Sequence, residues 1–331
     1  MNKEVVGILF ESQSDILAGD APERPSSYHW REQAEIDAVC GALHGLGYQV
    51  ELIGTLESLL ARSPTAPLDF VMNLSVRTES RNRTALAPAI LETMGVPYVG
   101  ADATAKALTL NKDLLKPYLA HLDIPTPPWV TITNPSDIPH TLVWERAVVK
   151  PAAEGNSLGV HVIDQSTPMS EISAMVEELL SGFGVPVMIE QLVEGREVCI
   201  AVGGEADQSL WGGSEVLTPS GKQMGSAVLD TKAKRAANHQ RHYPALDSAQ
   251  LDAARRSASQ FLARIGPVDY ASFDFRIDNN DIAMLIDVNL DATLHPERSL
   301  ARSIVGRGTT YQELIGRIVS RCASNTSRTT N

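Results

Sequence analysis

The sequence has few cysteines, no long apolar run and no excess of positive charge. Its three cysteines, Cys40, Cys199 and Cys322, lie far apart without a Cys-x-x-Cys pair. This spacing argues against a disulfide framework or a zinc site and favours free thiols in a reducing cytoplasm. No segment approaches the roughly 18 apolar residues of a membrane span, and the apolar part of the N-terminus is too short for a signal peptide. A net charge of −12 argues against nucleic-acid or anionic-membrane partners. We therefore expect a cytoplasmic protein.

The first third of the chain alternates between strand and helix patterns. Apolar, β-branched stretches predict strands at 4–10, 48–54 and 69–74, and helical spacing predicts helices at 31–46 and 84–94. Strands that alternate with helices imply a parallel sheet in an α/β domain. The length of 331 residues suits two or three domains, and this first domain is expected to end near residue 105.

The rest of the chain mixes both patterns and contains one long segment without periodicity. The patterns predict strands at 146–150, 186–191, 197–202, 271–277 and 282–288. Residues 203–247 are rich in polar residues and glycine, and so long a weakly structured segment is usually functional or mobile. A last helix is predicted at 310–323, followed by a disordered tail at 324–331.

A glycine-bearing turn, KPAAEGNSLG at 150–159, separates two predicted strands. Small residues let backbone N–H groups approach phosphate oxygens, and Lys150 supplies a compensating charge. No Gly-Lys-Ser/Thr closes the turn, so it is not a Walker loop. An ordinary surface hairpin is the alternative interpretation of this stretch alone.

Carboxylates and an amide occur on the predicted hairpin near the C-terminus. Asp287 and Asn289 share a face because strand side chains alternate, and Asp274 can lie opposite them on the partner strand. Two carboxylates and an amide oxygen suit Mg²⁺ together with bound phosphates. The polar face of a half-exposed strand would produce the same pattern.

Two further stretches complete the set of candidate motifs. IEQLVEGRE at 189–197 predicts a strand connector whose backbone can contact an adenine edge, with Glu190 and Glu197 as candidates for the ribose. Lysines in NKDLLK (111–116) and in the segment 203–247 add cations for a triphosphate. A solvent-exposed turn and solvated surface lysines are the alternatives.

These motifs, in this order, resemble the ATP-grasp superfamily and, within it, the D-alanine–D-alanine ligase family. The resemblance covers nearly the whole chain and is strongest in MGVPYVGADATAKALTLNKDLLKPYLAHLDIPTPPWV at 94–130. It implies an α/β fold of three domains, with an N-terminal parallel α/β domain and two α+β domains that sandwich ATP. The implied domains are 1–105, a central ATP-grasp subdomain at 106–184, and a C-terminal subdomain with the metal site at 185–323.

The resemblance also implies the residues of the nucleotide and metal sites. Phosphate lysines, a glycine-rich flap, an adenine connector and a ribose contact would be provided by Lys112, Lys150, Lys234, Glu154, Asn156, Ser157, Glu190, Gln191, Val193 and Glu197. Two Mg²⁺ ions would be held by Asp274, Asp287 and Asn289. Together they would neutralise ATP while its γ-phosphoryl group moves to a carboxylate. An amine then attacks the acyl phosphate, and the flap and the segment 203–247 would keep water out.

The half of the site that receives the amine departs from the family. Ser272 stands where the family has an arginine that stabilises the oxyanion, and Arg276 and Arg298 are the candidate replacements. Asp287 stands where a glutamate is usual. The metal loop reads NLDATLHPERS (289–299), with Thr293 in place of a glycine.

The loops of the first domain differ from the family as well. One carboxylate is needed there for a substrate ammonium, and the candidates are Glu11, Asp15 and Glu35. Arginines in SVRTESRNRT could bind an acidic substrate, or could belong to a solvated basic loop; they are Arg77, Arg81 and Arg83.

The sequence therefore predicts an ATP-dependent carboxylate–amine ligase for small amino-acid-like substrates other than, or not only, D-alanine. One alternative is a cell-wall D-alanine–D-alanine ligase with altered loops. Another is a nucleotide-binding regulator without catalysis, which Ser272 and Asp287 would favour. The resemblance also implies a homodimer.

Overall fold

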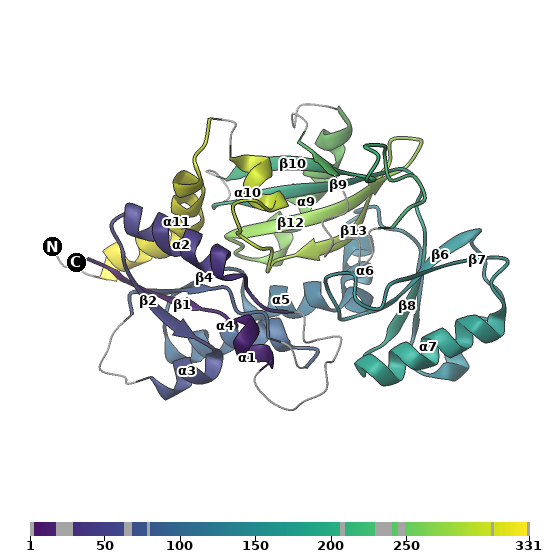
Figure 1. Ribbon diagram of the computed structural model, residues 1–331, viewed down its shortest axis with the longest axis horizontal. Coiled ribbons are helices and arrows are strands. Elements are labelled where there is room, and N and C mark those ends of the chain that lie inside the picture. Colours follow the sequence, from purple (N-terminus) through teal and green to yellow (C-terminus); the bar gives the residue numbers. More distant parts are fainter. Residues whose placement is uncertain are drawn as a thin grey trace.

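The computed structural model describes residues 3–17, 29–62, 68–77, 80–205, 209–228, 240–243, 249–305 and 308–329. The strands in these ranges form three sheets, each in its own layer with helices (Figure 1). The prediction of a three-domain α/β fold is confirmed. Among the described helices, none is both long and apolar enough to cross a membrane.

The N-terminal domain contains a parallel sheet with strand order β2-β1-β3-β4. Its strands are β1 (Val5–Leu9), β2 (Gln49–Gly54), β3 (Phe70–Asn73) and β4 (Tyr98–Val99). Its helices are α1 (Gln13–Leu17), α2 (Gln33–Gly45), α3 (Leu56–Ala61) and α4 (Arg83–Met94). The continuous apolar runs of β1 and β3 are buried, as expected for strands of a parallel sheet with both faces covered.

The central sheet is antiparallel, with order β5-β8-β6-β7. It consists of β5 (Trp129–Ile132), β6 (Arg146–Pro151), β7 (His161–Asp164) and β8 (Val187–Gln191), with the short 3-10 helix η2 (Pro135–Asp137) and α7 (Met169–Phe183). One face of α7 buries Ile172, Val176 and Leu179 against this sheet. Because β8 pairs with β5 and β6, a boundary at 184/185 would cut the sheet, and we propose a boundary after Gln191 instead.

The C-terminal sheet has the order β11-β10-β9-β12-β13 and is antiparallel. Its strands are β9 (Arg196–Gly203), β10 (Leu210–Leu217), β11 (Gln240–His242), β12 (Tyr270–Ile277) and β13 (Ala283–Asn289). The remaining helices are α5 (Ala103–Leu110), α6 (Lys112–His121), α9 (Ala249–Ile265), α10 (Ser299–Ile304) and α11 (Tyr311–Thr329). Leu115 and Leu119 of α6 pack with Phe261 and Phe273 in one core, so α6 is fixed to this body. α11 packs against α2 of the N-terminal domain (Figure 1).

Two predictions about the C-terminal half need correction. The segment 203–247 contains β10 and β11, and β10 was missed because LWGGSEVL carries two glycines. A Cβ on Gly212 would lie 2.5 Å from backbone atoms of Ser303, so the glycine allows α10 to approach the sheet closely. In addition, α11 continues to Thr329, which corrects the predicted start of a disordered tail at 324.

Candidate active site

The hairpin β12–β13 brings the three predicted metal ligands together. Asp274 lies opposite Asp287, and Ser272 lies opposite Asn289. A register shift directly after Asp274 has the form of a β-bulge, which bends a strand and redirects its side chains. Asp287 Oδ1 accepts the N–H of Val288 at 3.0 Å and lies 3.3 Å from Lys112 Nζ. The hairpin therefore presents paired carboxylates beside a lysine.

This set of side chains fits Mg²⁺ bound together with ATP. In the described part of the chain, no three His, Cys, Asp or Glu side chains cluster closely enough to hold a metal alone. Mg²⁺ commonly takes one or two carboxylates and completes its octahedron with phosphate oxygens and water. Asp274, Asp287 and the amide of Asn289 match that requirement, and their role as ligands stays a prediction.

A pocket between the central and C-terminal sheets brings together nearly all the predicted nucleotide residues. The lining includes Lys112, Lys150, Glu154, Asn156, Ser157, Glu190, Gln191, Val193, Glu197, Asp274 and Asp287. Apolar walls come from Val148, Leu192 and Ile286, as expected for a site that accepts a base ring. Lys234 lies outside the described residues, so its predicted contact with the γ-phosphate is not placed.

Glu190 lies in the strand predicted at 186–191, and its carboxylate contacts two lysines of the protein. It lies within β8, is 3% exposed, and its carboxylate is 2.9 Å from Lys150 Nζ and 2.5 Å from Lys116 Nζ. Burial alone would raise the pKa of Glu190, but the two ammonium groups outweigh burial and lower it. Burial lowers the pKa of Lys116 to about 8 despite the nearby carboxylate. The geometry assigns Glu190 to holding two lysines at the pocket wall.

Arg276 lies in the nucleotide pocket and not in the cavity beyond the hairpin. Its Nη2 is 2.9 Å from the carboxylate of Glu197, and its guanidinium also donates to the carbonyls of Gly225 and Ala227. Burial lowers the pKa of Arg276 even though Glu197 opposes the shift. Because Arg276 is engaged in these contacts, Arg298 is the better placed of the two candidates to replace the family arginine that stabilises the oxyanion. Ser272 is buried and is not among the described residues that line these two cavities.

A second cavity of about 450 Å³ adjoins the metal hairpin on the side of the N-terminal domain. This volume falls within the range of roughly 300–1,000 Å³ that is usual for small-molecule sites. Its wall is formed by residues before and within α2, by the flap (residues 152–160) and by the metal loop (289–299). We call it the substrate cavity.

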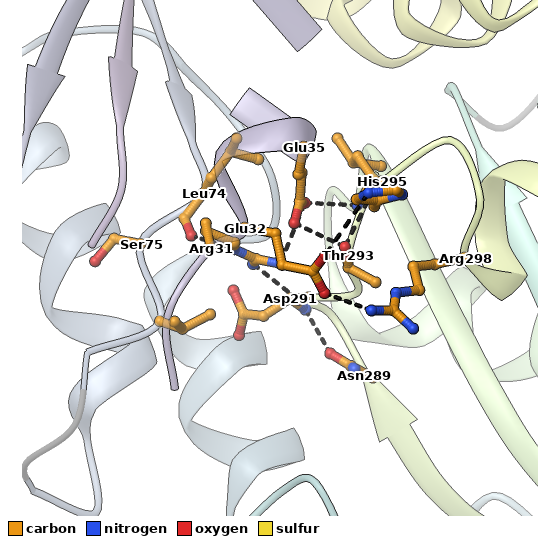
Figure 2. Close-up of polar contacts among 12 residues, drawn as sticks. Arg31, Glu32, Glu35, Leu74, Ser75, Asn289, Asp291, Thr293, His295 and Arg298 are labelled. Atoms are coloured by element: carbon orange, nitrogen blue, oxygen red, sulfur yellow. Dashed lines mark hydrogen bonds and ion pairs between the residues drawn. The ribbon is translucent and has the colours of Figure 1, made fainter. Parts of the chain in front are cut away.

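An ion-pair network fastens the metal loop to the N-terminal domain (Figure 2). Glu35 on α2 accepts hydrogen bonds from Thr293 Oγ1 and Leu294 N, both at 2.7 Å, and pairs with Arg31 at 3.4 Å. Arg31 Nη2 donates to Asp291 O at 2.9 Å. Glu35 is thus buried and engaged by the protein, which argues against its predicted contact with a substrate ammonium.

The other two carboxylate candidates are also engaged locally. Glu11 accepts hydrogen bonds from Ser75 Oγ at 2.7 Å and from the backbone N–H groups of Val76 and Arg77. Asp15 is exposed and accepts from Ser12 N and Oγ at the start of α1. Glu11 therefore shapes the loop after β3, and neither candidate lines the substrate cavity.

The arginines of SVRTESRNRT do not form a shared substrate site. Arg77 pairs with Glu57 at 2.8 Å, and Arg81 Nε donates to Asn111 Oδ1 at 3.1 Å. Arg83 lines the substrate cavity but is buried against Glu154. Each of the three is therefore engaged within the protein.

An exposed ion pair in the substrate cavity escaped the sequence analysis. Glu32 Oε1 lies 2.5 Å from Arg298 Nη2, and Glu32 Oε2 lies 3.7 Å from His295 Nε2 (Figure 2). The Arg298 side chain is 47% exposed, whereas Arg31 and Arg83 are buried. Arg298 was a sequence candidate, but Glu32 was missed because the pair joins residues 266 positions apart.

The sheets, the nucleotide pocket and the acidic hairpin define an ATP-grasp ligase. A model described as D-ala D-ala ligase C-terminus matches residues 118–320, more than half of the chain. The D-alanine–D-alanine ligase of Gloeobacter violaceus is 27% identical over 319 residues, which cover 92% of this chain and 98% of that one.

Solved structures share this architecture over nearly the whole chain. The D-alanine–D-alanine ligase of Bacillus anthracis complexed with ATP is 16% identical with a TM-score of 0.72, covering 98% of this chain and 99% of that one. The VanG D-Ala:D-Ser ligase of Enterococcus faecalis is 15% identical with a TM-score of 0.73, covering 97% and 100%. The chain belongs to the D-alanine–D-alanine ligase family of ATP-dependent ligases, as the sequence predicted.

Proposed function

We propose that the protein uses ATP and Mg²⁺ to activate the carboxylate of one amino acid and join it to the amine of another, with substrates other than D-alanine alone. The observation that carries the proposal is the exposed Glu32–Arg298 pair, which lines the same cavity as Asp274, Asp287 and Asn289. A guanidinium suits a substrate carboxylate and a carboxylate suits an ammonium. The cavity therefore offers both charges of an amino acid next to the phosphoryl-transfer site.

The chain's own residues would divide the work as follows. Lys112 and Lys150 counter phosphate charge from the pocket wall. The hairpin carboxylates would hold Mg²⁺, which would supply further positive charge to the triphosphate during transfer. The flap shields the acyl phosphate from water. Arg298 holds the carboxylate of the acceptor or stabilises the oxyanion formed when the amine attacks.

The departures of the metal loop from the family pattern favour the proposal that the substrates differ from those of the relatives. Thr293 donates to Glu35, and Asp291 is bound by both Arg31 and Lys106. These side chains fix the loop 289–295 in a path that depends on residues of the N-terminal domain. A changed loop changes the shape of the cavity that it lines, and shape together with charge decides between similar substrates.

The competing function is D-alanine–D-alanine ligation, which the names of several relatives favour. Purified protein with ATP and Mg²⁺ should be given single D- and L-amino acids and their pairs, while ADP, phosphate and amide product are measured. We expect ADP formation that requires a particular amino-acid pair and disappears with a chelator. Strong turnover on D-alanine alone would instead support the competing function, and ATP binding without substrate-dependent ADP would support a regulator.

Arg298 allows a direct test of substrate recognition. Arg298→Lys retains the charge but not the planar fork that binds carboxylates in two places. We expect a raised KM for the acceptor amino acid with little change in the KM for ATP. Arg302→Lys on α10 is the matched control, because Arg302 lines neither cavity in the described residues. Wild-type values of both the acceptor KM and kcat in Arg298→Lys would contradict the assignment.

A further inference from the structure

The flap, residues 152–160 between β6 and β7, is fastened at its start by groups from two helices. Lys112 N donates to Ala152 O at 2.9 Å, and Lys112 Nζ donates to Glu154 O at 2.8 Å. Arg83 Nη1 donates to Ala153 O at 2.9 Å. Three successive flap carbonyls are therefore bound by side-chain or backbone donors outside the central sheet, so the flap is not simply an extension of its own hairpin.

The side chains of the flap are held by a histidine from the N-terminal domain. His29 Nε2 lies 2.9 Å from Glu154 Oε2, and His29 Nδ1 lies 3.2 Å from Asn156 Nδ2. The exposed fractions of the His29 and Glu154 side chains are only 8% and 7%. Arg83 Nη2 approaches the same Glu154 oxygen at 3.3 Å.

The chemistry of these groups fixes the direction of each hydrogen bond. The amide nitrogen of Asn156 can only donate, so His29 Nδ1 is the acceptor. The ionised carboxylate of Glu154 can only accept, so His29 Nε2 donates to it at 2.9 Å, a shorter contact than the 3.5 Å between Nε2 and Arg83 Nη2. Burial raises the pKa of Glu154, but His29 and Arg83 outweigh burial and lower it. Glu154 is therefore an ionised carboxylate held by two donors from the N-terminal domain.

We propose that His29 and Arg83 are positioning residues that hold the flap over the phosphate end of the nucleotide pocket, so that flap closure depends on the N-terminal domain. We call the contacts of His29 and Arg83 with the flap the latch. Glu154 and Asn156 line both the nucleotide pocket and the substrate cavity, so the latch lies at the junction of the two. His29 acts through the flap and not on the reacting atoms. The inference rests on the proposed function for the statements that the flap covers phosphates and that it shields an acyl phosphate.

The consequence for the reaction is a coupling between the latch and water exclusion. When water reaches an acyl phosphate, it acts as the nucleophile and separates the acyl group from the phosphate group. The products are the free carboxylate and inorganic phosphate. With an opened flap, ADP would form without an equal amount of amide. A loosened latch should therefore raise the ratio of ADP to amide, which a general loss of active protein would not change.

Hydrogen exchange of the full-length protein tests the latch without any substrate. In His29→Ala, amides of residues 152–160 should exchange about tenfold faster than in wild type, as expected for the loss of a hydrogen bond to a charged group. The matched control is His161→Ala, since His161 is exposed at the start of β7 directly after the flap. Exchange in β12 and β13 should stay unchanged in both variants.

A second variant removes the same contact from the flap side. Glu154→Gln keeps the size of the side chain but loses its charge, and we expect similarly faster flap exchange. His29→Gln, whose amide can still donate to Glu154, should recover part of the protection. Wild-type flap exchange in Glu154→Gln, or in a folded His29→Ala, would overturn the latch.

The ADP-to-amide ratio of His29→Ala is the second measurement, made with whichever substrate pair the wild type uses. A ratio above that of wild type is expected, and an unchanged ratio despite faster flap exchange would overturn the link to water exclusion. The exchange experiment needs no turnover, so a failure of the proposed ligase activity and a failure of the latch are distinguishable.

Discussion

Replacing Glu190 by glutamine should destabilise the protein far more than the loss of one hydrogen bond. Wild type places one buried carboxylate between the ammonium groups of Lys150 and Lys116, at 2.9 Å and 2.5 Å. Glu190→Gln leaves two neighbouring lysines in the protein interior without the one carboxylate that both of them contact. Removing one partner of a buried ion pair costs about 3–5 kcal/mol, a large share of the roughly 5–15 kcal/mol that stabilises a typical protein.

Urea unfolding followed by tryptophan fluorescence measures this loss. Trp129 is a local reporter because Lys116 Nζ lies 5.2 Å from the centre of its ring. Glu194→Gln is the matched control: Glu194 is 56% exposed and 3.4 Å from Arg146, and exposed pairs of this kind contribute about 0–1 kcal/mol.

The dependence on pH gives the same prediction a second test. The pKa of Lys116 in the folded protein is lowered to about 8, whereas an unfolded lysine has a pKa of about 10.4. Between these values the unfolded state binds more protons, so stability rises with pH. Glu190→Gln should lower the folded pKa of Lys116 further, so that this rise begins at a lower pH. An unfolding free energy of Glu190→Gln equal to that of Glu194→Gln, with only nucleotide affinity reduced, would refute the assignment.

Two further substitutions test how the metal loop and α10 are held in place. Glu35→Gln should lose about 2–4 kcal/mol of stability, because Arg31 loses its buried partner and the amide presents only one acceptor oxygen to the metal loop. The control is Asp37→Asn, which is exposed on the same helix and should change the thermal unfolding temperature little. Equal losses of stability in the two variants would contradict the network. Gly212→Ala should cost about 1–3 kcal/mol because its Cβ would meet the Ser303 backbone at 2.5 Å. The control is Gly41→Ala, which has open space at its Cβ and should instead stabilise α2 by about 0.5–1 kcal/mol. A Gly212→Ala protein that is as stable as wild type in calorimetry would contradict the prediction and show that α10 is free to shift.

Local sequence patterns predicted most of the fold and the part of the site formed by the metal hairpin and the flap. The alternation of strand residues placed Asp287 and Asn289 on one face and Asp274 opposite, and the register of β12 and β13 pairs Asp274 with Asp287 as expected. The strand–turn–strand of the flap follows from two apolar runs around small residues. These features depend on neighbours within a hairpin, where sequence spacing fixes geometry.

Contacts between distant segments were beyond such patterns. Glu35 looked like a substrate ligand because a lone carboxylate on a helix gives no sign of the loop that it binds 258 positions later. Glu190 looked like part of a connector because its two lysines come from other elements, and β10 was missed because the partner that requires Gly212 lies on α10. Tertiary packing decides such positions and overrides local preference.

Transfer of oxygen-18 from a labelled substrate carboxylate to inorganic phosphate tests the central claim most directly. The claim predicts that phosphate released with ADP carries one oxygen atom from the amino acid that is activated, and that Asp274→Asn abolishes both ADP formation and this transfer. ATP consumption with no label in the phosphate, or with label in AMP, would contradict activation through an acyl phosphate at this site.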